Sequence, residues 1–264
     1  MTAHPRPPAL DLPDISQVRW TSFTKAIREP EQNWPAQICE RPIYVGHVGD
    51  RAMALLADPE AVRTVLTAPE TRFIKWRIYD RVVAAGAGRR NISATEGADC
   101  QRQRRILAPL LGPEAVAGLS PLFQEAAGRA VRAWRRQGGE VRIEAGLETT
   151  RIALDVISRL MFATPVDDPV RPDVDRVARL AYAAQSEGRL NDAAAPLASL
   201  IRPATGPHSE AEIRANPFLG LGQAPLPQGL STEELHDNAR LFLNAGHETT
   251  TLTMTWSLWL LGRD

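Results

Sequence analysis

The sequence predicts a mainly α-helical protein with a small β region near its N-terminus. Residues 231–261 carry apolar and small side chains at steps of three and four, the period of a helix with one packed face. The tracts 112–137 and 144–162 show the same period, and two short strand-like segments lie within residues 41–57. We treat residues 1–264 as one domain organised around the helix 231–261.

The helix 231–261 begins with a capping box. Ser231 stands three residues before Glu234, so that each side chain can bond a free backbone amide of the first turn. At about 1.5 Å per residue the helix is roughly 45 Å long, which is long for a globular protein.

The middle of this helix is locally unfavourable. Ala245–Thr250 reads Ala-Gly-His-Glu-Thr-Thr, and glycine alone costs about 1 kcal/mol against alanine in a helix interior. The Thr249 hydroxyl is placed to bond the carbonyl of Ala245, which often bends a helix. We therefore expect distorted hydrogen bonding from Ala245 to Thr249, and such local conflicts tend to mark functional sites.

Ala245–Thr250 resembles the oxygen-binding motif on the central helix of the cytochrome P450 family, the haem-thiolate monooxygenases. The family pattern is a small residue, glycine, any residue, an acid and threonine, and every position matches. The resemblance implies that Ala245 and Gly246 lie over the face of the haem. It also implies two catalytic residues: Thr249 hydrogen-bonds dioxygen, and Glu248 relays protons.

Other interpretations of the same segment are weaker. A zinc protease helix needs a second histidine four residues after His247, where this chain has Thr251. A membrane span needs about 20 apolar residues, and Arg240, Asn244 and Glu248 interrupt the run. A plain core helix with a threonine-rich surface remains as the structural alternative.

Residues 97–110 carry a second resemblance. Family members commonly have an aromatic residue or histidine four positions before an arginine, and the pair grips a haem propionate. The arginine maps to Arg104, whose guanidinium suits a carboxylate, but the first partner is Cys100. This departure removes one expected propionate donor. A basic, solvated helix face is the alternative.

Composition narrows the function classes. The 31 basic and 31 acidic residues balance, which argues against a general nucleic-acid binder. Residues 1–13 lack the apolar run of a secretory signal, and Cys39 and Cys100 fit neither a disulfide framework nor a metal site. We expect a cytoplasmic protein of the soluble bacterial type, with no membrane partner.

The remaining elements follow from local signals. An extended proline-rich arm is expected at 1–19, strands at 41–48 and 51–56 around a Gly49-Asp50 turn, and a helix capped by Asp58. Residues 71–96 are irregular, and the family's equivalent loop covers the substrate pocket. The other expected elements are a brief strand at 141–143, helices at 20–29, 144–162, 173–186 and 191–201, and an irregular lid zone at 203–229.

The resemblance covers about residues 41–264, and we expect a P450 fold truncated after the central helix. The family's later Glu-x-x-Arg helix and cysteine loop are not found, since Glu60–Arg63 and Glu148–Arg151 match the first pattern too early. No cysteine follows Cys100, so we expect no metal ligand in this chain. Without a thiolate pushing electron density to the iron, O–O cleavage should not proceed.

The resemblance implies the N-terminal part of an enzyme that hydroxylates an organic small molecule. It would use haem, O2 and NAD(P)H-derived electrons from ferredoxin/reductase-type partners. We expect this chain alone to be inactive and prone to aggregate, with Phe242, Leu252, Trp256, Trp259 and Leu260 uncovered. A non-catalytic helical binding scaffold and a non-functional remnant are the alternatives. A Soret band with added haem, and its response to carbon monoxide, separates them.

Overall fold

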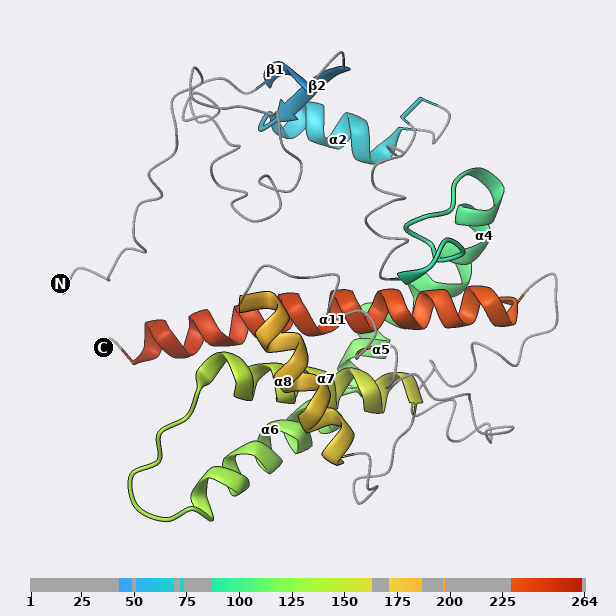
Figure 1. Cartoon of the computed structure of the whole chain (residues 1–264). Coiled ribbons are helices and arrows are strands. Elements are labelled where there is room, and N and C mark those ends of the chain that lie inside the picture. The colour runs from blue at the N-terminus through green and yellow to red at the C-terminus, as the bar shows by residue number, and fades with distance from the viewer. Residues whose placement is uncertain are drawn as a thin grey trace. The chain divides into compact units, whose positions relative to one another are not determined.

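A computed structural model describes residues 43–48, 51–68, 72–73, 87–162, 171–186, 197 and 229–262 (Figure 1). The chain divides into two compact units, Met1–Ile74 and Lys75–Asp264, and each is described by itself. The expected arm at 1–19, the helix at 20–29 and nearly all of the 191–229 region lie outside the described residues.

The first unit contains the small β region. Strands β1 (Ile43–Val48) and β2 (Arg51–Leu56) pair antiparallel, with Ile43 opposite Leu56. Helix α2 (Pro59–Thr67) follows, and the Asp58 carboxylate accepts a 2.7 Å hydrogen bond from the backbone amide of Ala61. The hairpin and the capped helix confirm the sequence prediction.

The second unit is helical, which confirms the predicted fold class. Its elements are α4 (Gly97–Leu107), the 3-10 turn η3 (Ala108–Leu111), α5 (Pro113–Gly118), α6 (Ser120–Arg135), α7 (Ala145–Phe162), α8 (Arg171–Ser186) and α11 (Thr232–Leu261). The tract 112–137 is two helices, which meet at the buried Leu119. The strand expected at 141–143 is wrong, because these residues form an irregular connection before α7.

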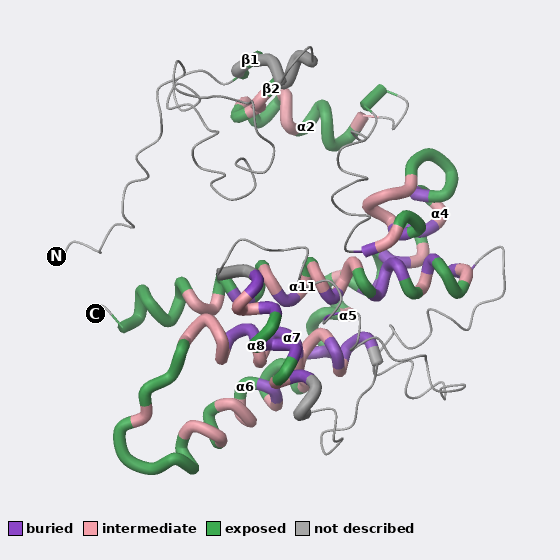
Figure 2. The backbone as a smooth tube through the Cα atoms, viewed as in Figure 1, coloured by how far each residue is buried: buried purple, intermediate pink, exposed green. Residues whose placement is uncertain are grey.

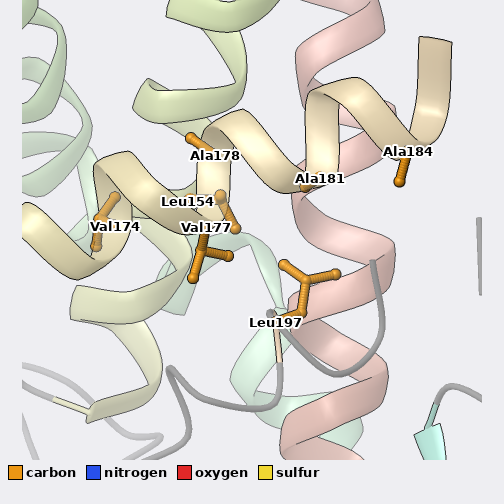
Figure 3. Close-up of a cluster of buried hydrophobic side chains, with 7 residues drawn as sticks. All are labelled: Leu154, Val174, Val177, Ala178, Ala181, Ala184 and Leu197. Atoms are coloured by element: carbon orange, nitrogen blue, oxygen red, sulfur yellow. The ribbon is translucent and has the colours of Figure 1, made fainter. Parts of the chain in front are cut away.

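Helix α7 is the centre of the second unit and packs against α6, α8 and α11. Between α7 and α8 lies a buried cluster in which Leu154 contacts valines and alanines of α8 (Figure 3). Between α6 and α7, Arg129 forms a 2.5 Å ion pair with Asp155. The Trp134 indole donates a 3.0 Å hydrogen bond to Glu148 across the same interface. Apolar and paired polar contacts therefore fix α7 on all three partners.

Helix α11 is one α-helix of 30 residues, and both hydrogen bonds of the predicted capping box are present. Every residue from Thr232 to Leu261 is α-helical, so the helix is not interrupted between Ala245 and Thr249, where distorted hydrogen bonding was expected. The Thr249 hydroxyl does donate to the Ala245 carbonyl, at 2.9 Å. The helix accommodates this bond without a break.

The two halves of α11 differ in burial (Figure 2). Its first half joins a buried cluster: Leu107, Leu110, Leu119, Leu160, Met161, Leu230 and Ala239. Toward the C-terminal end the apolar side chains are exposed, including Leu252, Trp256, Trp259 and Leu260. Phe242, which was expected on the same uncovered face, is instead partly buried against the cluster. None of the described helices is long and apolar enough to cross a membrane.

Helix α11 is joined to α4 and to the turn before it by polar side chains, of which all but the partly buried Arg102 are buried. We call this group the polar joint: Arg102, Gln103, Glu234, Asp237 and Asn238. The Arg102 guanidinium pairs with the Glu234 carboxylate and donates to the Gly229 carbonyl at 3.1 Å. The Asn238 amide donates to the Gln103 side-chain oxygen at 2.8 Å. Because these groups have partners, their burial does not leave orphaned donors or charges.

Glu234 is the most connected residue of the polar joint, since it also accepts from the Ser231 amide at 2.9 Å in the capping box. Burial by itself would raise the pKa of its carboxyl. The hydrogen bond from Arg102 and the bond from the Ser231 backbone outweigh burial, and the pKa lies below its ordinary value. The carboxylate is therefore charged at neutral pH and holds both helices.

Asp237 ties the turn at residues 87–95 to α11. Its carboxylate accepts a 2.8 Å hydrogen bond from the Arg90 amide and lies against Gly88. Gly88 has φ of +80°, and a Cβ built there would overlap the Asp237 carboxylate. Glycine is required here by backbone conformation and by space.

We expect Gly88→Ala to destabilise the fold by more than about 2 kcal/mol, since strained backbone costs about 1–2 kcal/mol before Asp237 is displaced. Two alanine variants separate the causes. Gly97 has φ of +57° with open space, and Gly118 is helical with open space. In urea unfolding, Gly118→Ala should be neutral or stabilising, Gly97→Ala mildly destabilising and Gly88→Ala the worst. Equal losses at positions 88 and 97 would contradict the close approach of Asp237.

Glu234→Gln should lower the free energy of unfolding by about 1–3 kcal/mol at neutral pH, the worth of hydrogen bonds to a charged group. The pKa of Glu234 is lowered by folding, so its contribution is present above the unfolded pKa near 4.3 and lost as pH falls through the folded value. The wild-type curve should therefore approach that of the variant in acid. The exposed neighbour variant Glu233→Gln is the control, and parallel curves for wild type and Glu234→Gln would rule out this linkage.

Candidate functional site

The candidate site is the exposed side of α11 around Ala245 and Thr249. These residues are one turn apart, so they share a side of the helix, and both are exposed. His247 and Thr251 lie on the opposite side and are buried, at 8% and 2% exposure. Packing against α7 therefore divides the motif into an inward and an outward face.

Gly246 faces α7. A Cβ at Gly246 would lie 3.2 Å from Cδ1 of Ile157, a contact tighter than most side chains accept. On the same interface, the hydroxyls of Thr149 and Thr255 are 2.7 Å apart. The glycine thus has a packing role in the close approach of the two helices, separate from the cofactor contact that the resemblance implies.

Thr249 presents a hydroxyl whose proton is already used. It donates to the Ala245 carbonyl at 2.9 Å, and the Thr253 hydroxyl donates to the Thr249 carbonyl at 2.9 Å one turn later. Because a hydroxyl has one donor and two lone pairs, the Thr249 oxygen retains acceptor capacity toward the exposed side. The Thr249 oxygen can therefore accept a hydrogen bond from a donor group on the exposed side of α11.

His247 occupies the variable position of the motif and faces the interior. Burial lowers the pKa of its imidazole, and the hydrogen bond with the Leu243 carbonyl offsets this only in part. The Nδ1 atom is 2.8 Å from that carbonyl, which can only accept, so Nδ1 carries the hydrogen. His247 is a neutral structural residue and takes no part in the exposed face. Glu248, the expected proton relay, is only partly buried between the two faces.

On α4, Arg104 is exposed and Cys100 is buried. The Cys100 thiol is 3.6 Å from the Ile92 carbonyl, to which it donates, and it is buried like Leu107 of the same helix. Cys100, the residue that departs from the family pattern, thus lies in the interior. Arg104 lies exposed on the surface of α4.

The described residues offer some of the groups that a haem needs. Ala245 offers a small side chain, Thr249 a hydroxyl and Arg104 a guanidinium for a carboxylate, and all three are exposed. Among residues that the structure describes, no cluster of three or more His, Cys, Asp or Glu forms a metal site. Cys100 is a free, buried cysteine whose thiol donates a hydrogen bond to the Ile92 carbonyl. The described residues fit the face and edge of a haem and supply no axial thiolate.

Sequence reasoning missed the polar joint. Glu234 was recognised as a cap, but its pairing with Arg102, 132 positions earlier, has no local signal. The available hint was the run of polar residues at positions 234, 237 and 238, which share one side of an otherwise packed helix. A buried polar stripe of this kind predicts a polar partner, although not which one.

Comparisons with known proteins agree with one another. Residues 31–214 match the family model described as cytochrome P450. The chain is 25% identical over 251 residues to cytochrome P450 72A13 of Arabidopsis thaliana, covering 79% of this chain and 46% of the relative. It is 29% identical over 114 residues to the cytochrome P450 monooxygenase eriI of Hericium erinaceus, covering 42% and 21%.

The fold also resembles a solved structure. The crystal structure of the cytochrome P450 CYP102L1 aligns with a TM-score of 0.53 and 17% identity, over 88% of this chain and 57% of that one. The chain spans less than half of the two curated relatives. The family match ends at residue 214, before α11, so it is independent of the motif at 245–250. By this match, over more than half of its length, the chain belongs to the cytochrome P450 family.

Proposed function

We propose that this chain is the N-terminal and central part of a haem-dependent monooxygenase that hydroxylates an organic small molecule. The observation that carries the proposal is the exposed pair Ala245 and Thr249, with the threonine hydroxyl oriented by the alanine carbonyl. The family match outside this segment supports it. The expected partners are O2, the substrate and ferredoxin/reductase-type electron donors that use NAD(P)H.

Within this proposal each residue of the site has one task. Ala245 leaves room for a flat ring against α11, and Gly246 lets α7 approach from the other side. Thr249 accepts a hydrogen bond at the oxygen-binding side. Glu248, the preceding residue, brings a carboxylate to move a proton toward that hydroxyl.

Arg104 is proposed to bind a haem propionate through charge-assisted hydrogen bonds. When bound, the haem supplies the activation of dioxygen. The axial cysteine implied by the family is not among the described residues, so the proposal assigns to this chain contact and proton-handling residues only. We also propose that the 264-residue chain does not turn over substrate by itself.

The exposed end of α11 is consistent with this assignment to part of a larger fold. Trp256 and Trp259 meet edge to face with ring centroids 5.4 Å apart, and both are exposed. Large exposed apolar patches are rare in stable monomers. The scaffold and remnant alternatives differ from the proposal in haem binding: neither requires a Soret band on titration with haem.

Thr249→Val should lower turnover of the haem-loaded, full-length protein by about 100-fold, the low end of the roughly 10²–10⁴-fold that proton handling by a positioned group is typically worth. The free energy of unfolding should change by less than about 0.5 kcal/mol, because the site is exposed. NAD(P)H oxidation and product formation with a screened organic substrate measure the effect.

Thr253→Val is the matched control for this substitution. Thr253 is also exposed and makes the same bond to the carbonyl four residues earlier. Its variant should retain normal turnover. Equal losses at the two positions, or no loss in Thr249→Val, would refute the catalytic assignment of Thr249.

A further inference from the structure

The amide pair of Gln103 and Asn238 is the part of the polar joint with the most restrictive geometry. Both side chains are fully buried, at 0% exposure. The Asn238 amide nitrogen donates to Gln103 at 2.8 Å and to the Glu234 carbonyl at 2.8 Å, while its oxygen accepts from the Ile92 amide at 3.0 Å. Both amide hydrogens of Asn238 and one lone pair of its oxygen are therefore used.

Gln103 is equally constrained. Its oxygen accepts from Asn238, and its nitrogen donates to the Arg90 carbonyl at 2.9 Å. Rotating either amide by 180° would set two oxygens or two nitrogens against each other, a buried mismatch that costs the full desolvation penalty. The pair therefore holds α4 in one rotation about its axis.

This rotation decides where Arg104 points, because Arg104 directly follows Gln103. Residues of a helix are about 100° apart, so with Gln103 directed at α11 the next side chain leaves at the flank of the contact. The structure agrees: Gln103 is buried and Arg104 is exposed. An amide pair is directional because each of its hydrogen bonds needs a donor opposite an acceptor.

The other member of the pair lies on the same side of α11 as the candidate site. Asn238 precedes Ala245 by seven residues, two turns of helix, so the two differ by only about 20° around the axis and about 10 Å along it. Asn238 is buried and bonded to Gln103 of α4 and to the Ile92 amide, whereas Ala245 is exposed. The bonds from α4 thus reach this side of α11 two turns before the motif begins.

We infer that Gln103 and Asn238 are positioning residues that hold Arg104 beside the Ala245–Thr249 side of α11, in place to bind a carboxylate of a ligand seated there. The inference rests on the proposed function for the identity of the ligand as haem. Two uncharged interior residues, Gln103 and Asn238, thereby determine the position of the charged Arg104. Neither residue touches the ligand.

A reciprocal exchange of side-chain length tests this. Gln103→Asn and Asn238→Gln each disturb the pair, and the double variant restores one long and one short amide. Each single variant should weaken haem binding about tenfold, the low end for loss of an orienting partner at a metal site, measured by Soret titration. The double variant should recover to within about twofold. Gln101→Asn, at an exposed position of α4, is the matched control and should bind normally.

The Arg104→Ala background distinguishes positioning from general stability. If the pair acts through Arg104, Gln103→Asn should have no further effect on haem affinity in that background. A tenfold loss in both backgrounds, or no recovery in the double variant, would overturn the inference.

Hydrogen exchange of residues 97–107 provides a readout without haem. Protection of α4 should fall in each single variant and return in the double variant. If the wild-type protein binds no haem while this pattern holds, the proposed function fails and the placement of α4 by the pair stands. If protection is unchanged in the single variants, the positioning inference fails whatever the protein binds.

Discussion

The close packing of α11 against α7 is the constraint on which the rest of the second unit depends. Gly246 lies against Ile157, and Thr149 meets Thr255 through their hydroxyls, so the two helices approach along small side chains. This contact turns His247 and Thr251 inward and leaves Ala245 and Thr249 outward. The packing interface with α7 thus leaves Ala245 and Thr249 as the motif residues available for chemistry, although neither of them is part of that interface.

The two ends of α11 are held by different physical means. Its first half is fixed by the polar joint and by an apolar cluster around Leu107 and Ala239. The ion pair and amide pair are directional, whereas burial of apolar surface is not, so the polar contacts supply orientation to a joint that the apolar cluster stabilises. The C-terminal end has exposed tryptophans and leucines instead. The candidate site lies at the transition between the two.

Local features were predictable from the sequence, and long-range ones were not. The capping box at Ser231, the hairpin before α2 and the bond from Thr249 to Ala245 follow from spacing alone, and each is present. The brief strand at 141–143 failed because a strand needs a partner, which composition cannot supply. A helix distortion was expected because glycine and threonine weaken a helix in isolation. In the folded chain the helix continues unbroken through this segment, because packing of Gly246 against Ile157 supports it.

The candidate site was predicted only in part for the same reason. The motif identified Ala245 and Thr249, but no local signal told that Gly246 faces α7 or that Cys100 is interior. The polar joint joins residues more than 100 positions apart, so its pairs are visible only in the folded chain. Family membership now rests on residues 31–214, and the site itself on α11 and α4.

The central claim is that the Ala245–Thr249 side of α11 faces the bound haem. Thiol protection tests it most directly, with single cysteines introduced at Thr249 and at Ser257 in a background from which Cys39 and Cys100 have been removed. Position 257 is two turns, about 12 Å, further along and is also exposed. The account predicts that haem slows maleimide modification at position 249 at least severalfold and leaves position 257 unchanged. Equal rates with and without haem at position 249, in a protein that shows a Soret band, would contradict it.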